Sequence, residues 1–388
     1  MELTHYKDLE ISEKTKKAIA DLGFEKMTEV QQKAIPPMME GKDIVVKAPT
    51  GTGKTFAFGV PLVEKADPEA TLPQFLILSP TRELAVQIHD EIVKLTKYLP
   101  SVRSVVLYGG APIHKQIVTL KKRPQIIVAT PGRMLDHIKR RTVKLSQIQT
   151  VVLDEADEML DMGFFKDVCK IIDQVPENKQ LALFSATISR EVMDLMWLYQ
   201  REDTIEITVT PDKESEPKIT QYSLECSGYA KVDYLIRILR LYDYQRVIVF
   251  SNTRRGTEMI RRRLAEKKFP VEALSSDVNQ KRRNQIMKQF KAHSLQVLVA
   301  TDVAARGIDV SDVDAVFNFD VPQDNTSYLH RIGRTGRAKK EGVSFIFYTS
   351  TEIGRMKEII RYTKSNIIPL RFSEGGILEP LPESEYPF

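Results

Sequence analysis

The feature that most constrains the fold is a glycine-rich run that directly follows a short apolar stretch. Residues 44–46 are Ile-Val-Val, and residues 48–55 read Ala-Pro-Thr-Gly-Thr-Gly-Lys-Thr. A strand, a glycine-rich turn and a helix N-terminus together aim backbone N–H groups and the helix dipole at polyphosphate. The lysine adds a positive charge for the β- and γ-phosphates, and the last threonine can ligate Mg²⁺. The run therefore predicts a phosphate-binding loop, although Ala48 stands where the strict pattern has glycine.

A second motif, about a hundred residues later, supplies acidic groups at the end of another apolar stretch. Residues 151–153 are Val-Val-Leu, and residues 154–157 read Asp-Glu-Ala-Asp. Asp154 can hold a metal ion, and Glu155 can orient or deprotonate a water molecule. Taken separately, a glycine-rich turn is often structural and an Asp-Glu pair is usually a solvated turn. The order of the two motifs and their strand context together predict an NTPase.

Composition sets the broad class of protein. The 388 residues suggest two or three domains, and 42% apolar with 28% charged residues is ordinary for a soluble globular chain. Only Cys169 and Cys226 occur, which suits a reducing compartment and argues against a disulfide framework or a zinc site. The N-terminus has no apolar signal region, and no run approaches the roughly 18 apolar residues of a membrane span. A cytoplasmic location is expected.

Strand-like apolar runs alternate with amphipathic helical stretches along the whole chain, which predicts an α/β fold with parallel sheets. The polar run 208–218 carries two prolines and is the best linker candidate. We expect domains at 1–208 and 219–372, a linker at 209–218, and an acidic, loosely ordered tail at 373–388. The expected strands are 44–47, 75–78, 105–107, 126–129, 150–153, 181–184, 247–250, 271–274, 297–300, 315–319 and 344–348.

The two halves of the chain resemble each other at two strand ends. Ser-Pro-Thr-Arg at 79–82 matches Ser-Asn-Thr-Arg at 251–254, and Val-Ala-Thr recurs at 128–130 and 299–301. The nearly constant offset indicates a duplicated α/β unit. Only the first copy has a glycine-rich loop. The second copy is the basic one, with a formal charge of +6 over residues 209–388 against −1 before them, which is consistent with attraction to a phosphate backbone.

An arginine cluster lies in the later part of the second copy. Residues 328–337 read Tyr-Leu-His-Arg-Ile-Gly-Arg-Thr-Gly-Arg, so three guanidinium groups are spaced around small glycines. The planar guanidinium groups, each with parallel N–H donors, can approach phosphates closely. They suggest arginine fingers that domain closure delivers to a nucleotide bound by the first half. A basic loop that serves solubility or nucleic-acid binding is the alternative interpretation.

With these motifs, the chain resembles the DEAD-box RNA helicases of helicase superfamily 2 over about residues 6–372. Residues 154–157 match the motif that names the family, residues 185–187 (Ser-Ala-Thr) its next motif, and residues 330–337 its last. Residues 80–84, 109–110, 130–133, 300–302 and 306–309 match further motifs in family order. The resemblance implies two tandem RecA-like domains, each a mainly parallel sheet flanked by helices.

The resemblance also implies a nucleotide site for ATP and Mg²⁺. Gln31 is the base-reading amide, and Tyr6 stands where family members usually have a phenylalanine that stacks on adenine. Ser185 and Thr187 are expected to bond with Asp157 and His330. The implied catalytic residues are Lys54, Asp154, Glu155, Ser185, Thr187, His330, Arg334 and Arg337. The implied nucleotide-binding residues are Tyr6, Gln31, Thr50, Gly51, Thr52, Gly53, Lys54, Thr55, Asp302 and Arg334, with Thr55 and Asp154 as ligands of Mg²⁺, partly through water.

RNA is expected to lie across both halves, held mainly at its sugar-phosphate backbone, so that little sequence is read. The implied contacts are Pro80, Thr81, Arg82, Gly109, Gly110, Thr130, Arg133, Asn252, Thr253, Arg254, Asp277, Arg283 and Thr301. One departure concerns residues 275–277, which are Ser-Ser-Asp where the family often has His-Gly-Asp. The RNA approach is more crowded there.

The activity implied is an ATP-dependent RNA helicase in which RNA stimulates ATP hydrolysis and the two domains close on single-stranded RNA. Closure would bend one strand and separate a short duplex locally, or remodel a ribonucleoprotein. We expect a monomer that recruits protein partners for targeting. An RNA-remodelling scaffold without net unwinding uses the same residues. A DNA translocase of the same superfamily is a third possibility, disfavoured by Tyr6, Gln31 and the His-Arg start of the last motif.

Overall fold

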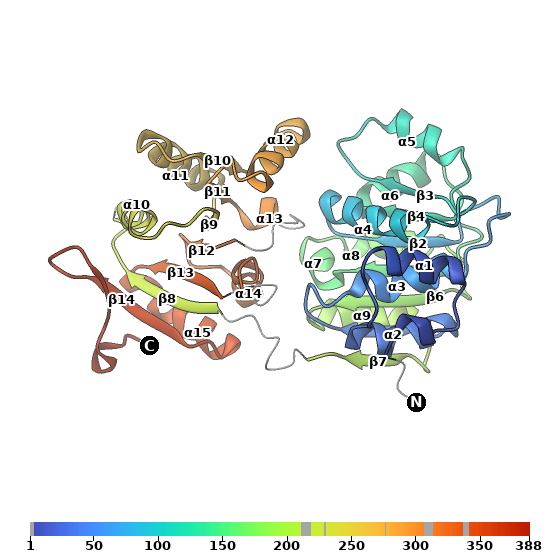
Figure 1. The fold of residues 1–388 in the computed structure, drawn as a ribbon, viewed down its shortest axis with the longest axis horizontal. Coiled ribbons are helices and arrows are strands. Elements are labelled where there is room, and N and C mark those ends of the chain that lie inside the picture. The colour runs from blue at the N-terminus through green and yellow to red at the C-terminus, as the bar shows by residue number, and fades with distance from the viewer. Residues whose placement is uncertain (1–3, 211–218, 229, 276, 306–312, 337–340) are drawn as a thin grey trace. The chain divides into compact units, whose positions relative to one another are not determined.

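The structure is a computed structural model, and it describes all residues except 1–3, 211–218, 229, 276, 306–312 and 337–340. The chain divides into two compact units, Met1–Pro211 and Asp212–Phe388, here called domain 1 and domain 2. Most of the expected linker lies outside the described residues. Each domain is a central sheet with helices on both faces (Figure 1).

The sheet of domain 1 has seven strands among the described residues, in the order β3-β4-β2-β5-β6-β1-β7, and every pairing is parallel. The strands are β1 (Ile44–Lys47), β2 (Phe75–Leu78), β3 (Ser104–Leu107), β4 (Ile126–Ala129), β5 (Thr150–Asp154), β6 (Gln180–Ser185) and β7 (Ile205–Thr208). The helices are α1 (Glu13–Asp21), α2 (Glu29–Met39), α3 (Lys54–Glu64), α4 (Arg82–Leu95), α5 (Ile113–Leu120), α6 (Pro131–Lys139), α7 (Ala156–Asp161), α8 (Phe165–Ile172) and α9 (Arg190–Tyr199), preceded by the 3-10 helix η1 (Tyr6–Asp8).

The central strands read as continuous apolar runs because both of their faces are covered. Val46, Ile77 and Val152 pack into one core with helices α1 to α4. Their neighbours Val45 and Leu153 point to the other face and pack with helices α6 to α9. This is the usual reason that strands of a parallel sheet lack the polar alternation of a half-exposed strand.

Domain 2 has eight strands among the described residues, in the order β10-β11-β9-β12-β13-β8-β14-β15. They are β8 (Ile219–Glu225), β9 (Val247–Phe250), β10 (Val271–Leu274), β11 (Val297–Ala300), β12 (Ala315–Asn318), β13 (Gly342–Tyr348), β14 (Ile367–Phe372) and β15 (Leu378–Pro380). The helices are α10 (Lys231–Leu241), α11 (Arg254–Glu266), α12 (Gln280–Lys291), α13 (Asp302–Ala305), α14 (Asn325–Ile332) and α15 (Ile353–Thr363), with 3-10 helices η2 (Ser350–Glu352) and η3 (Glu383–Glu385).

The two strand orders match one to one from β3 and β10 at one edge to β7 and β14 near the other. The duplication suggested by the repeated strand ends is therefore present in the topology: β2 and β9 are equivalent, and so are β4 and β11. Because all equivalent strands run parallel, their carboxyl ends meet at one edge of each sheet. Ligand sites in open α/β sheets lie at that edge.

The C-terminal segment differs from expectation. A loosely ordered tail at 373–388 is wrong, because β15 pairs antiparallel with β14 and Glu383–Glu385 forms a 3-10 helix. Arg371 forms ion pairs with Glu379 at 3.1 Å and with Glu385 at 3.4 Å. The Phe388 ring packs against Tyr348 with ring centroids 5.7 Å apart. The acidic residues are thus partly neutralised by an arginine of the strand they cover.

Within the described residues, none of the helices combines the length and the apolar character needed to cross a membrane.

Candidate functional site

The glycine-rich loop connects β1 to α3 at the carboxyl edge of domain 1. Gly51 and Gly53 have φ angles of 81° and 91°, in the left-handed region that favours glycine. A Cβ atom on Gly53 would lie 2.5 Å from Nε2 of Gln31, so a side chain there would collide with that amide. Thr52 Oγ1 donates to the Pro49 carbonyl at 2.9 Å, and Thr55 lies half-buried in the first turn of α3. The loop has the shape expected of a phosphate cradle.

Lys54 is the first residue of α3 and is 5% exposed. Its Nζ donates to Glu155 Oε1 at 3.0 Å and to the Ala48 carbonyl at 3.2 Å. Burial alone would lower the pKa of Lys54, but the nearby carboxylates of Glu155 and Asp154 outweigh burial and raise it. The lysine is therefore a charged group held at the mouth of the loop.

Asp154 ends β5 as a nearly dehydrated carboxyl group. It is 3% exposed, and its buried Oδ1 has no hydrogen-bond partner. Burial and the adjacent Glu155 raise the pKa of Asp154 to about 7, although Lys54 opposes the shift. Glu155 has a φ of 49°, a strained conformation for a residue other than glycine, and such strain is typical of functional sites.

These residues fit a magnesium ion. An unpartnered buried carboxylate oxygen is costly unless a ligand satisfies it, and oxygen atoms are the ligands that Mg²⁺ prefers. Asp154 provides such an oxygen, and the Thr55 hydroxyl lies on the helix that follows the loop. The two residues could hold the metal between them and a bound phosphate.

A hydrogen-bond network joins the acidic motif to the end of β6. Asp157 Oδ2 accepts from the Thr187 backbone N–H at 2.8 Å and from its hydroxyl at 2.7 Å. Ser185 Oγ accepts from the Asp157 backbone N–H at 3.1 Å and donates to the Thr187 carbonyl at 2.7 Å. The expected contacts of Asp157 with Ser185 and Thr187 are therefore present. His330 belongs to domain 2, and the expected contact with it stays a prediction.

Tyr6 and Gln31 meet in the interior beside the glycine-rich loop. The Tyr6 hydroxyl donates to Gln31 Oε1 at 2.7 Å, and the same oxygen accepts from the Thr28 backbone N–H at 2.8 Å. Gln31 Nε2 donates to the Gly53 carbonyl at 3.1 Å. Tyr6 is 4% exposed, and burial raises its pKa. The sequence did not reveal this pairing, whose only signal was a tyrosine where the family usually has phenylalanine.

The candidate RNA contacts of domain 1 lie at the carboxyl ends of β2, β3 and β4. Thr81 caps α4 by accepting from the Leu84 backbone N–H at 3.3 Å. Arg82 packs so closely on Gly110 (φ 83°) that a Cβ atom there would collide with its guanidinium group. Arg133 Nη1 donates to the Ala111 carbonyl at 3.1 Å. Pro80 and Thr130 are buried and Gly109 is half-buried in the same region.

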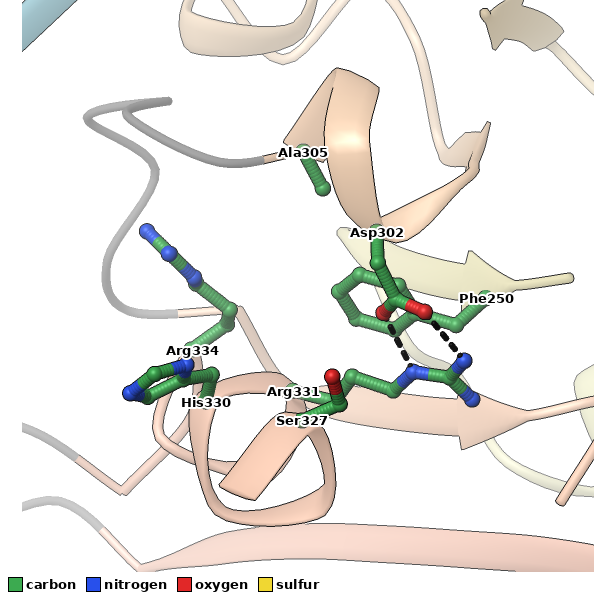
Figure 2. A pocket seen from close by; sticks show the side chains of 7 residues that line it. All are labelled: Phe250, Asp302, Ala305, Ser327, His330, Arg331 and Arg334. Carbon is green, nitrogen blue, oxygen red and sulfur yellow. Dashed lines mark hydrogen bonds and ion pairs between the residues drawn. The ribbon is translucent and has the colours of Figure 1, made fainter. Parts of the chain in front are cut away.

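Domain 2 contains a buried arginine that the sequence analysis missed. Arg331 is 1% exposed and forms two 2.6 Å contacts with the Asp302 carboxylate. It also donates to Asn252 Oδ1 at 2.8 Å and to the Asp320 carbonyl at 2.8 Å. Figure 2 shows this pair facing each other, while His330 and Arg334 point away from it. The only signal in the sequence was the first of the three arginines of residues 330–337.

This arrangement changes the interpretation of two residues. Asp302, expected to bind nucleotide, is occupied by Arg331. Asn252, expected to contact RNA, uses its side-chain oxygen for Arg331 and its Nδ2 for the Val321 carbonyl at 2.9 Å. Both side chains organise the loops of domain 2 in this state.

The remaining candidates of domain 2 are at strand ends or outside the described residues. Arg254 and Asp277 form an exposed ion pair at 2.6 Å. Thr253 and Thr301 accept hydrogen bonds from the first turns of α11 and α13. Arg283 Nη2 donates to the Ala304 carbonyl at 2.8 Å. Arg337 and Ser276 lie outside the described residues.

Two tandem parallel sheets, with a phosphate loop and an acidic strand end in the first, define a RecA-like nucleotide-hydrolysing motor. Family models agree with this class: residues 28–195 match the DEAD/DEAH box helicase model, and residues 230–339 match the helicase conserved C-terminal domain. The chain belongs to the DEAD-box ATP-dependent RNA helicases.

Two curated relatives and two solved structures illustrate the similarity. The DEAD-box ATP-dependent RNA helicase CshA of Bacillus cereus is 44% identical over 362 residues, which cover 93% of this chain and 69% of the relative. The Geobacillus kaustophilus CshA is 43% identical over 93% of this chain and 77% of its own. Saccharomyces cerevisiae Dbp5 bound to RNA and ADP BeF3 superposes with a TM-score of 0.84 at 28% identity, covering 94% and 96% of the two chains. Mss116p bound to single-stranded RNA and AMP-PNP gives 0.83 at 29%, covering 97% and 81%.

Proposed function

We propose that this chain hydrolyses ATP with Mg²⁺ at the glycine-rich loop of domain 1, and that hydrolysis is coupled to RNA binding across both domains. The observation that carries the proposal is the buried Lys54–Glu155 ion pair beside the unpartnered Oδ1 of Asp154. Lys54, Glu155 and Asp154 are groups that could serve as a phosphate-binding cation, a base and a metal ligand. Three buried titratable groups kept together at such a cost are typical of a functional site.

The ion pair suggests how the residues act in turn. Lys54 Nζ donates to the Glu155 carboxylate at 3.0 Å. A bound polyphosphate offers the ammonium group a stronger partner, so Lys54 would turn to it and release Glu155. The freed carboxylate could then orient and deprotonate the attacking water. Mg²⁺, held by Asp154 and Thr55, would neutralise charge that develops on the phosphate oxygens.

Coupling to RNA would use residues of both domains. We propose that ATP and RNA together draw the domains closed, so that Arg334 and Arg337 reach the γ-phosphate. The hydrogen-bond network of Asp157, Ser185 and Thr187 would couple the bound nucleotide to His330 of domain 2. Closure on one strand would bend it, which gives local duplex separation without long translocation.

The coupling can be tested by measuring affinity for a fluorescent single-stranded RNA with and without a non-hydrolysable ATP analogue. Because coupling is reciprocal, the analogue should tighten RNA binding and RNA should tighten analogue binding by the same factor. Steady-state ATP turnover should rise with RNA and not with DNA of the same sequence. Equal RNA affinities in the two states would refute the clamp, and stimulation by both nucleic acids would favour a DNA translocase.

An RNA-remodelling scaffold that uses ATP only to set its residence time has the same residues. Release of a labelled strand from a short duplex separates the two activities, since only the helicase releases it. Action as a monomer, a cytoplasmic location and protein partners for targeting stay predictions.

A further inference from the structure

Domain 1 contains a second hollow that the nucleotide and RNA sites do not use. A groove of about 430 Å³ is formed by the last turns of α4, the start of β3 and the end of α5. The helix α4 begins at Arg82, among the candidate RNA contacts, and ends at Leu95 beside the groove. The groove thus lies at the amino end of β3, whereas the known site lies at the carboxyl ends of the strands. Its volume is within the range of small-molecule sites.

The groove is positively charged. The twelve residues that line it all lie in the described part of the chain, and none of them is acidic. Lys97, Arg103 and Lys122 contribute three cations. Lys97 is paired with Asp21, outside the lining. Arg103 Nη1 donates to the Lys122 carbonyl at 2.8 Å, which fixes its guanidinium group at the rim.

The remaining wall combines apolar surface with polar groups. Leu99, Val102 and Pro124 offer flat apolar contact, and Thr119 is one of three hydroxyl-bearing residues in the lining. His89 Nε2 is buried and has no hydrogen-bond partner. Burial lowers the pKa of His89, although its bond to the Ser104 backbone opposes this, so the ring is neutral near pH 7. Because Nε2 is buried, it is not open to a ligand in the groove. The Thr119 hydroxyl donates to the Lys115 carbonyl at 2.9 Å, and its oxygen can still accept a hydrogen bond.

We propose that this groove binds a phosphate monoester with a flat, hydroxyl-bearing body, that is, a single nucleotide unit. Lys97, Arg103 and Lys122 would hold the phosphate, the apolar wall would cover the base or sugar, and the Thr119 hydroxyl oxygen would accept from a ribose hydroxyl. A free nucleoside monophosphate and the 5′-terminal nucleotide of an RNA strand share this chemistry. The proposal does not depend on the residue roles proposed for ATP hydrolysis.

The test is calorimetric titration of the full chain with uridine 5′-monophosphate, inorganic phosphate and uridine. We expect one site for the monophosphate, weaker binding of phosphate and none for uridine. Lys122→Gln should weaken monophosphate binding about tenfold, since it removes one charge-assisted contact. Lys121→Gln is the matched control: both lysines are exposed neighbours, but only Lys122 lines the groove. Its affinity should equal that of the parent chain.

The phosphate loop could also take the probe, so every titration is repeated in a Lys54→Ala background. A binding signal that disappears in this background, equal effects of the two lysine substitutions, or equal binding of uridine and its monophosphate would each overturn the proposal. Thr119→Val gives a second check, with weaker binding of uridine monophosphate but unchanged binding of inorganic phosphate. Displacement of the probe by 5′-phosphorylated oligouridylate, but not by its 5′-hydroxyl form, would identify an RNA end as the source. Absence of displacement would identify the free nucleotide.

Discussion

The two domains carry the same lysine at the same place in the same fold, yet only one of these lysines lies in a candidate nucleotide site. Lys54 begins the helix after β1, and Lys231 begins the helix after β8, its equivalent strand. The strand ends are also equivalent, because the Ala48 N–H donates to the Ser185 carbonyl and the Cys226 N–H donates to the Tyr348 carbonyl, both at 2.9 Å. The lysine alone therefore does not make the site.

The difference lies in what surrounds each lysine. Sheet register pairs Leu78 with Leu153 in domain 1 and Phe250 with Asn318 in domain 2, so Phe319 stands where domain 1 has Asp154. The Phe319 ring is 4% exposed and lies 5.9 Å from Lys231 Nζ. An aromatic ring thus fills the place of the metal-binding carboxylate.

Lys231 has carboxylate neighbours, as Lys54 does, but they belong to loops of domain 2. Its Nζ lies 3.6 Å from Glu352 and 3.9 Å from Asp320. Asp320 in turn accepts from the Ser251 hydroxyl at 2.7 Å and the Asn252 N–H at 2.9 Å. In domain 2 the duplicated lysine lies beside a ring and beside a carboxylate that bonds to a loop, whereas the carboxylate bonded to Lys54 lies beside the glycine-rich loop.

The largest expected effect comes from removing each lysine in turn. Lys54→Ala should lower ATP turnover by about 10²-fold or more, because it removes a positioned charge at the phosphates. Lys231→Met should keep most turnover but lower the free energy of unfolding by about 2 kcal/mol, allowing for partly exposed carboxylates. Steady-state turnover and urea unfolding of both variants check this. Loss of turnover in a folded Lys231→Met protein would contradict the division of roles.

The second prediction concerns pH, because Asp154 can be protonated, whereas Phe319, at the equivalent position of domain 2, cannot. The pKa of Asp154 is about 7 in the folded state, far above the ordinary value of 3.8. A folded-state pKa that is raised means that the native state binds the proton more tightly, so ionisation costs stability. The metal-free protein should therefore lose stability as pH rises from about 4 to about 7, by a total on the order of a few kcal/mol.

Asp154→Asn should remove this slope, and Mg²⁺ should offset it in the parent chain, because the ion stabilises the charged form. Hydrogen exchange, corrected for the intrinsic pH dependence of amide exchange, should locate the weakening at β5 and leave β12 unchanged. A parent chain whose stability stays flat over this pH range would show that Lys54 compensates the carboxylate fully.

Much of this difference between the two domains could be predicted from the sequence, because it depends on short sequence motifs. Glycines 51 and 53 and the apolar run before Asp154 fixed the loop and the acidic strand end without any knowledge of packing. The expected strands 44–47, 75–78 and 126–129 agree with β1, β2 and β4. These strands are buried on both faces, so their apolar runs are unbroken.

Three strands that contain polar residues or a proline escaped prediction. β7 reads Ile-Glu-Ile-Thr, β8 carries polar residues on one face, and β14 contains Pro369. Each of these strands is defined by its pairing with a neighbouring strand. A local sequence pattern does not reveal that pairing. Arg331 escaped for a related reason, because an arginine in a basic run reads as exposed until its partners Asp302 and Asn252, far away in sequence, are known.

The smallest expected effect concerns Tyr6 and Gln31, which cover the loop of domain 1. Gln31 Oε1 already accepts two hydrogen bonds, from Tyr6 and Thr28, and Nε2 gives one hydrogen to Gly53. One N–H remains for a base, but no acceptor. The Gln31 amide could donate to a ring nitrogen of any purine. It could not accept a hydrogen bond from the amino group that distinguishes adenine.

Tyr6→Phe therefore should free one lone pair of Gln31 for the adenine amino group. We expect the preference for ATP over ITP, measured as the ratio of kcat/KM values, to rise about 2- to 10-fold, the worth of one hydrogen bond. Stability should fall by about 1 kcal/mol, since the Tyr6 hydroxyl leaves a buried bond. A lowered preference would instead mean that the hydroxyl holds Gln31 in its reading position. Tyr98→Phe, which removes a hydroxyl that donates to Asp21 and not to Gln31, should leave the ratio unaltered.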